Sequence, residues 1–65
     1  MSEVWVVIHG FDYEGDDVVG VYSTHARAVA AALAVESSAP WLVDGPDRWR
    51  TESRYVRVFR HEVKS

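Results

Sequence analysis

The chain has 65 residues, of which 48% are hydrophobic and 26% charged, and its formal net charge is −3 at pH 7. This balance is that of an ordinary globular protein and argues against intrinsic disorder. A chain of this length forms a single domain, residues 1–65, with a thin core. Because it contains no cysteine, disulfides and thiolate zinc sites are excluded as stabilising devices, and we expect a homodimer.

Acidic and basic side chains are separated along the chain. Residues 1–47 carry eight acidic side chains and one basic one, whereas residues 48–65 carry six basic side chains and two acidic ones. The first part therefore has a charge of −7 and the second a charge of +4. Such a separation predicts a polar partner or the pairing of unlike ends.

The sequence also bears on the compartment. It lacks the run of about 20 apolar residues that a membrane span requires, so we expect no membrane association. The first three residues, Met-Ser-Glu, lack the basic side chains that open a signal peptide. With the absence of cysteine, these features predict a cytoplasmic protein.

The first half of the chain predicts a hairpin. Residues 4–9, Val-Trp-Val-Val-Ile-His, have a strand composition, and both of their faces are apolar, so both should be covered. Residues 10–17 predict an acidic turn, and residues 18–22 a second, antiparallel strand. Gly20 in the middle of that strand predicts a bulge or a close approach of the helix.

An alanine-rich run follows, and it predicts a helix over residues 26–35 that is capped by Ser23 or Thr24. Pro40 sets the limit beyond which the helix does not continue. The spacing i, i+3, i+4, i+7 predicts that the buried stripe consists of Ala26, Val29, Ala30 and Leu33.

The rest of the chain predicts a loop and a third strand. Residues 41–50 contain the turn sequence Asp-Gly-Pro-Asp and predict a loop anchored by two tryptophans. Residues 54–63 predict a strand that joins the free edge of the first strand and runs parallel to the second. The expected fold is therefore α+β, a three-stranded ββαβ sheet with one helix packed on one face.

One helix covers only one face of such a sheet. The other face would remain open, and an open apolar face on so small a domain predicts an interface. A second copy of the chain is the expected occupant. We place Trp5, Val7 and Phe59 in this self-interface.

The acidic turn does not carry the full pattern of a calcium loop. Asp12, Glu14 and Asp16 alternate as at the start of such a loop, but its sixth and twelfth positions require glycine and glutamate. Asp17 and Ser23 occupy these positions. A solvated acidic turn is therefore predicted.

Other catalytic and metal-binding patterns are also missing from the sequence. His9, His25 and His61 come from three separate segments, with His9 and His61 on neighbouring strands, and no cysteine accompanies them. No serine or threonine stands in a recognisable nucleophile motif with histidine and an acid. The chain is therefore predicted to be non-enzymatic, with no metal and no cofactor.

The basic C-terminal part interleaves arginine with aromatic residues. This mixture is typical of protein interfaces and also of sites for single-stranded nucleic acid. Because the whole chain is acidic, we favour a protein partner, then a solvated strand face, then nucleic acid, and a nucleotide or small anion held by Arg57 or Arg60 is a further alternative. The predicted partner-binding residues are Trp41, Trp49, Arg50, Arg54 and Arg57. The two tryptophans have an alternative role, which is to cap one end of the thin core.

Two stretches resemble a group of short bacterial and phage proteins of unknown function. They are V-W-V-V-I-H-G at residues 4–10 and V-G-V-Y-S-T-H-A-R-A at residues 19–28. Proteins of that group begin with a V-W/Y-V-V strand and show a V-F/Y-S-T turn into a helix with an alanine near its start. The resemblance covers about half of the chain and implies a sheet-plus-helix domain with an accessory role in a phage or mobile element. We therefore expect a small binding module that engages a host protein.

Overall fold

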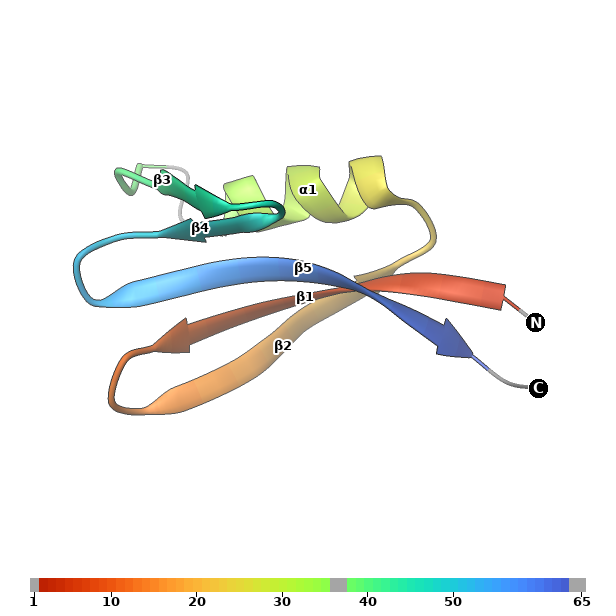
Figure 1. Cartoon of the computed structure of the whole chain (residues 1–65), viewed down its shortest axis with the longest axis horizontal. Helices are drawn as coiled ribbons and strands as arrows, with labels where there is room; N and C mark the ends of the chain where they lie inside the picture. Colours follow the sequence, from red (N-terminus) through yellow and green to blue (C-terminus); the bar gives the residue numbers. More distant parts are fainter. Residues whose placement is uncertain (1, 36–37, 64–65) are drawn as a thin grey trace.

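The computed structural model describes residues 2–35 and 38–63. These residues form one helix and a single antiparallel sheet with the strand order β2-β1-β5-β4-β3 (Figure 1). The α+β class is therefore confirmed, whereas the expected three-stranded ββαβ sheet is wrong because the sheet has five strands. The elements are β1 (Ser2–Phe11), β2 (Gly15–Tyr22), α1 (His25–Ala34), β3 (Leu42–Gly45), β4 (Arg48–Arg50) and β5 (Arg54–Val63).

The longest pairing joins β1 to β5, the two ten-residue strands. Their antiparallel ladder runs from Ser2 opposite Val63 to Phe11 opposite Arg54. The other edge of β1 pairs with β2, also antiparallel. As predicted, β5 therefore lies on the free edge of β1 and runs parallel to β2.

The segment expected to be a loop, residues 41–50, instead supplies the strands β3 and β4. Arg48–Arg50 pairs with the free edge of β5, and Leu42–Gly45 pairs with Arg48–Arg50 in turn. The turn between them depends on backbone with positive φ at Gly45 (144°) and Asp47 (56°), and the carbonyl of Asp47 accepts a hydrogen bond from the Val58 backbone N–H at 2.9 Å. A strand of three residues is too short to hold alone, so the edge of β5 provides the template that orders this hairpin.

The predicted irregularity near Gly20 is a β-bulge. Val7 faces Gly20, but the next residue, Ile8, faces Val18, so Val19 is an extra residue in β2. A bulge increases the local twist of the pair. The atoms nearest to a side chain at position 20 would belong to Tyr22 and not to the helix.

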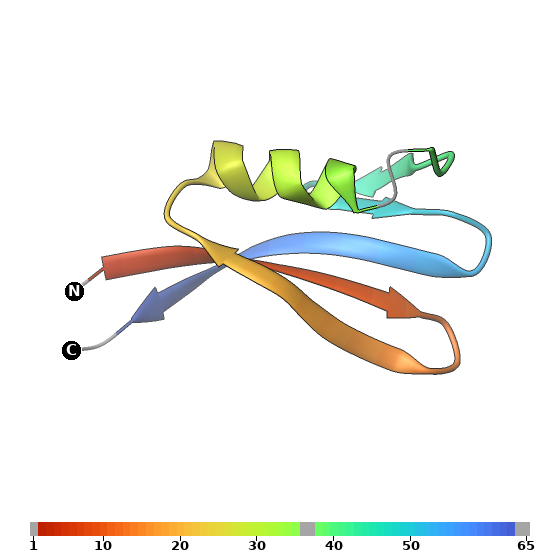
Figure 2. The ribbon, with the colours of Figure 1, turned by 180° about the vertical axis from the view of Figure 1, so that it is seen from behind.

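Helix α1 begins after Thr24 and lies against one face of the sheet (Figures 1 and 2). Of the two predicted caps, Thr24 fills the role: its Oγ1 accepts a hydrogen bond from the Arg27 backbone N–H at 3.2 Å. The histidine that opens the helix is tied to the β3–β4 turn, because His25 Nε2 lies 2.7 Å from Asp47 Oδ1. The predicted limit at Pro40 is consistent with a helix that ends at Ala34.

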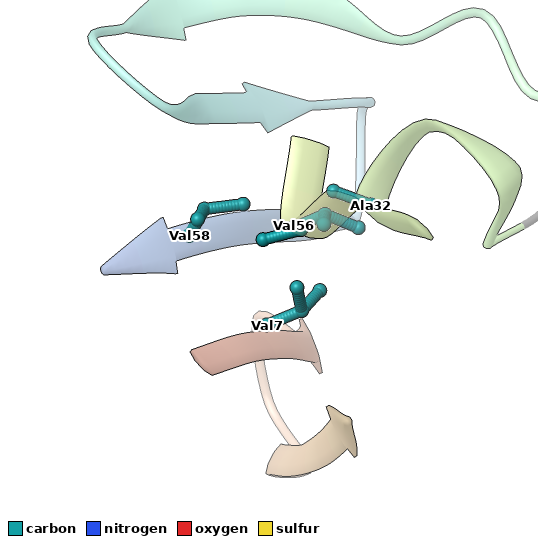
Figure 3. Close-up of a cluster of buried hydrophobic side chains, with 5 residues drawn as sticks. Val7, Ala32, Val56 and Val58 are labelled. Carbon is teal, nitrogen blue, oxygen red and sulfur yellow. The ribbon is translucent and has the colours of Figure 1, made fainter. Parts of the chain in front are cut away.

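Small side chains make up the core between helix and sheet. Val7 and Val56 are fully buried, and they contact the helix through alanines, which allow a close approach (Figure 3). Five half-buried side chains surround this centre: Trp5, Tyr22, Val35, Trp41 and Trp49. We refer to the buried residues Val7, Ala28, Ala32, Val56 and Val58 as the core cluster.

The buried stripe of the helix differs from the predicted one. Ala28 and Ala32 are buried, whereas Ala26, Ala30 and Leu33 are exposed and Val29 is half-buried. The predicted phase was wrong because apolar residues surround the whole helix, so periodicity does not select a face. Over Val7 and Val56 the helix presents its smallest side chains, and Leu33 remains 43% exposed.

This phase can be tested by placing the same charge on two sides of the helix. Ala28→Asp should abolish the cooperative melting transition, because an unpaired buried carboxylate costs about 3 kcal/mol or more, a large part of the stability of a small domain. Ala30→Asp should cost about 0.7 kcal/mol, the difference in helix propensity between the two residues. Circular dichroism melting of both variants decides the question, and equal losses of stability would contradict the assigned phase.

Candidate binding face

The two faces of the sheet carry different side chains. Val7 of β1 and Val56 and Val58 of β5 point toward the helix, and residues alternate along each strand. The residues between them therefore lie on the side that no described element covers, which we call the open face. Across β2, β1 and β5 this face carries an apolar strip, which consists of Val6, Ile8, Val18, Val21 and Phe59.

Three side chains of the apolar strip are exposed to solvent, whereas Val6 is half-buried and Ile8 is only 6% exposed. Val18 is 62% exposed, Val21 57% and Phe59 39%. In both ribbon views α1 lies on one side of β1, β2 and β5, and this is the side opposite the open face (Figures 1 and 2). A contiguous apolar surface of this kind is typical of an interaction site.

Three arginines extend the open face beyond the apolar strip. Arg48 lies directly opposite Arg57, and Arg50 directly opposite Tyr55. A pocket of about 290 Å³ opens between these side chains. We call it the arginine pocket, and it is lined by Asp44, Arg48, Trp49, Arg50, Tyr55, Val56 and Arg57.

Each of the three guanidinium groups has a different environment. Arg50 donates to Asp12 through Nη2, at 3.1 Å from Oδ2 and 3.3 Å from Oδ1. The guanidinium of Arg57 lies 5.4 Å from the centre of the Phe59 ring, a cation–π contact that joins the pocket to the apolar strip. The guanidinium of Arg48 lies close to Gly45: a Cβ atom added at Gly45 would be only 2.9 Å from Arg48 Nη2.

Tyr55 crosses from β5 over β1 to reach β2. Its hydroxyl donates a hydrogen bond to Asp16 Oδ2 at 3.0 Å. The ring passes over Gly10, where a Cβ atom would lie 2.6 Å from the tyrosine oxygen, so only glycine leaves room for this crossing. The hydrogen bond to the Asp16 carboxylate, more than any other cause, raises the pKa of Tyr55 above its ordinary value of 10.

The predicted partner-binding residues are divided between the two faces. Arg50 and Arg57 lie on the open face, whereas Trp49, opposite Val56, lies on the helix side. Trp41 and Trp49 are half-buried against the core cluster, which is the arrangement expected of residues that cap it. The guanidinium of Arg54 lies 5.4 Å from the centre of the Trp41 ring.

The predicted self-interface residues are divided in the same way. Val7 is fully buried beneath the helix, and Trp5 packs against the core cluster, so neither lies on the open face. Phe59 does lie there. Placing Trp5 and Val7 in the self-interface requires that they face away from the helix, and the structure instead puts both on the helix side.

Sequence reasoning missed Arg48 and Tyr55. The signal was present, because Arg48 and Arg50 alternate with Trp49 just as Tyr55 and Arg57 alternate with Val56. The alternation would have placed these residues on one face if residues 48–50 had been recognised as a strand.

The three histidines do not form a site. His9 lies on the helix side, with its ring 5.1 Å from that of Phe11 and 6.3 Å from that of Trp41, and His61 lies opposite Val4 on the open face. The Nε2 atom of His9 is buried and has no hydrogen-bond partner among residues 2–35 and 38–63. Within those residues no group of three or more His, Asp or Glu side chains is arranged to hold a metal ion.

The tyrosine contact predicts a pH effect with a definite sign. Because the pKa of Tyr55 is raised in the folded state, its hydrogen bond stabilises the fold fully below about pH 10 and is lost as the pH rises through the raised value. Tyr55→Phe should therefore melt at a lower temperature than the parent chain at neutral pH, and the difference should shrink above about pH 10. Tyr13→Phe is the control, because Tyr13 is 81% exposed. A difference for Tyr55→Phe that does not depend on pH would contradict the assignment.

No helix in the described part of the chain is long and apolar enough to cross a membrane. Comparison of the chain with models of protein families, with curated proteins and with solved structures finds no match in any of the three. The resemblance to short bacterial and phage proteins stays a prediction from the sequence. The geometry of the open face is therefore the basis for a functional assignment.

Proposed function

We propose that this chain is a non-enzymatic protein-binding module that acts through the open face, with a second copy of itself as the occupant. The observation that carries the proposal is the exposed apolar strip on a sheet whose other face is already covered by α1. Valine and phenylalanine supply contact area and no acid–base chemistry, which favours binding over catalysis.

The small core supports a second copy as the occupant. Six hydrophobic side chains are buried in the described part of the chain, and two of them are alanines. A domain with so little buried apolar surface is usually stabilised by a disulfide, a metal or oligomerisation, and this chain has no cysteine. An interface of standard size buries about 800 Å² on each partner, under a fifth of the 4536 Å² surface of this molecule.

The engagement of a host protein stays a prediction. Of its proposed residues, Trp41 and Trp49 are half-buried, and Arg50 and Arg57 belong to the other face. An exposed residue of the same hairpin, Val43 of the edge strand β3, lies opposite Trp49 and therefore on the other face from the proposed dimer. A further protein is therefore able to approach the chain without displacing the second copy.

The dimer can be tested with one substitution at two exposed valines. Val21→Lys places an ammonium group in the apolar strip and should raise the dimer dissociation constant by roughly a hundredfold or more, since burying an unpaired charge costs several kcal/mol. Val43→Lys makes the same change on the opposite face of β3, where the side chain is 77% exposed, and should leave the dimer intact. Sedimentation velocity across a dilution series measures both constants.

Circular dichroism spectra establish that each variant is folded before its assembly is compared. A parent chain that sediments as a monomer at millimolar concentration would refute the dimer. Equal weakening by both substitutions would place the interface elsewhere.

A further inference from the structure

The arginine pocket contains an arrangement that costs stability. Arg48 and Arg57 stand directly opposite each other on neighbouring strands, and like charges at such positions destabilise a sheet. Asp12 partly compensates Arg50, but within the described part of the chain Arg48 and Arg57 form no ion pair. The fold therefore places two arginines without an ion-pair partner in the described residues at opposed positions of neighbouring strands.

Each of these two exposed groups has a neighbour that orients it. Arg57 rests on the Phe59 ring, and Arg48 lies in the space that Gly45 leaves by having no side chain. Arg50 is oriented at the rim by its two contacts with Asp12. Guanidinium groups held in this way lose little conformational freedom when they bind, and each offers a planar fork of N–H donors to an anion.

The charge of the lining indicates the charge of the ligand. Three arginines and one aspartate line the pocket, which leaves an excess of two positive charges. A phosphate monoester carries about −1.5 to −2 at pH 7 and accepts several charge-assisted hydrogen bonds. Asp44 on the same lining favours a ligand that also carries a hydrogen-bond donor, such as a sugar hydroxyl.

The size of the pocket and its aromatic lining narrow the class of ligand that it could bind. A volume of about 290 Å³ lies at the lower limit of small-molecule sites, which begin at about 300 Å³. Tyr55 lines the pocket on the open face, and an aromatic side chain of this type stacks on nucleobases. A long polyanion is disfavoured, because Asp12 and Asp16 lie along the same face on the side of β1 and β2. We propose that the arginine pocket binds a nucleoside monophosphate, with Arg48 and Arg57 clamping its phosphate.

Binding can be measured by calorimetric titration of the full chain with adenosine monophosphate, inorganic phosphate and adenosine. The monophosphate should bind more tightly than phosphate, and adenosine should bind far more weakly than either. Arg57→Gln and Arg48→Gln should each weaken the monophosphate by roughly tenfold or more, the loss expected for a charge-assisted hydrogen bond. The control is Arg60→Gln, which removes one positive charge from the same strand outside the pocket. Arg60 Nη1 lies 3.4 Å from Glu3 Oε2, and the Arg60→Gln variant should bind the monophosphate as tightly as the parent chain does.

A second measurement separates ligand recognition from a structural role. Without ligand, Arg57→Gln should melt at a higher temperature than the parent chain, because it removes the repulsion from Arg48. Added monophosphate should raise the melting temperature of the parent and of Arg60→Gln but not that of Arg57→Gln. A purely structural arginine would behave in the opposite way and lower the melting temperature when it is replaced.

Several results would overturn the inference. They are no binding of the monophosphate at millimolar concentration, equal binding of adenosine, and equal weakening by Arg60→Gln. Tighter, steeply salt-dependent binding of a single-stranded oligonucleotide would make nucleic acid the occupant instead. None of these outcomes bears on the dimer, which is measured without ligand and depends on the apolar strip.

Discussion

The ladder between β1 and β5 is the constraint on which the rest of the structure depends. It joins the two ends of the described chain over ten residue pairs, and each of its faces is used differently. On one face it presents Val7, Val56 and Val58, the sheet side of the core cluster, and on the other Val6, Ile8 and Phe59. The sheet grows outward from both edges of this pair, with β2 on β1, β4 on β5, and β3 on β4. A slip of one residue in its register would exchange the two faces, so the core and the candidate binding surface are fixed together.

The parts of the fold that the sequence predicts are the long ones. The bounds of β5, the position of the helix and the parallel relation of β5 to β2 are confirmed, because ten-residue patterns and a threonine cap are strong local signals. The β3–β4 hairpin was missed because its strands of four and three residues are too short for a periodicity to be visible, and β5 supplies most of the reason that they form. A pattern within a segment does not reveal a template that comes from another segment.

The faces were harder to predict than the elements. Both parities of β1 and most sides of α1 are apolar, so the hydrophobic pattern does not distinguish inside from outside. The structure resolves this ambiguity through size: alanines approach Val7 and Val56 closely, while the tryptophans lie around the edge of the core. This is why Trp5 and Val7, expected in a self-interface, lie under the helix, and why the predicted partner-binding residues fall on two faces. The candidate site could be recognised only after the strand register was known.

The charge separation along the sequence takes on a new meaning in the folded chain. The pairing of unlike ends that it predicts occurs within one molecule, because the β1–β5 ladder brings the basic C-terminal part beside the acidic N-terminal part. Arg60 lies near Glu3, and Arg50 near Asp12. These ion pairs are exposed, so each contributes little stability, but together they account for part of the basic excess. Arg48 and Arg57 are different, because the register that buries Val56 also forces them to face each other. Like charges at such positions destabilise a sheet, and an anion bound between the two arginines, as we propose, would offset that repulsion.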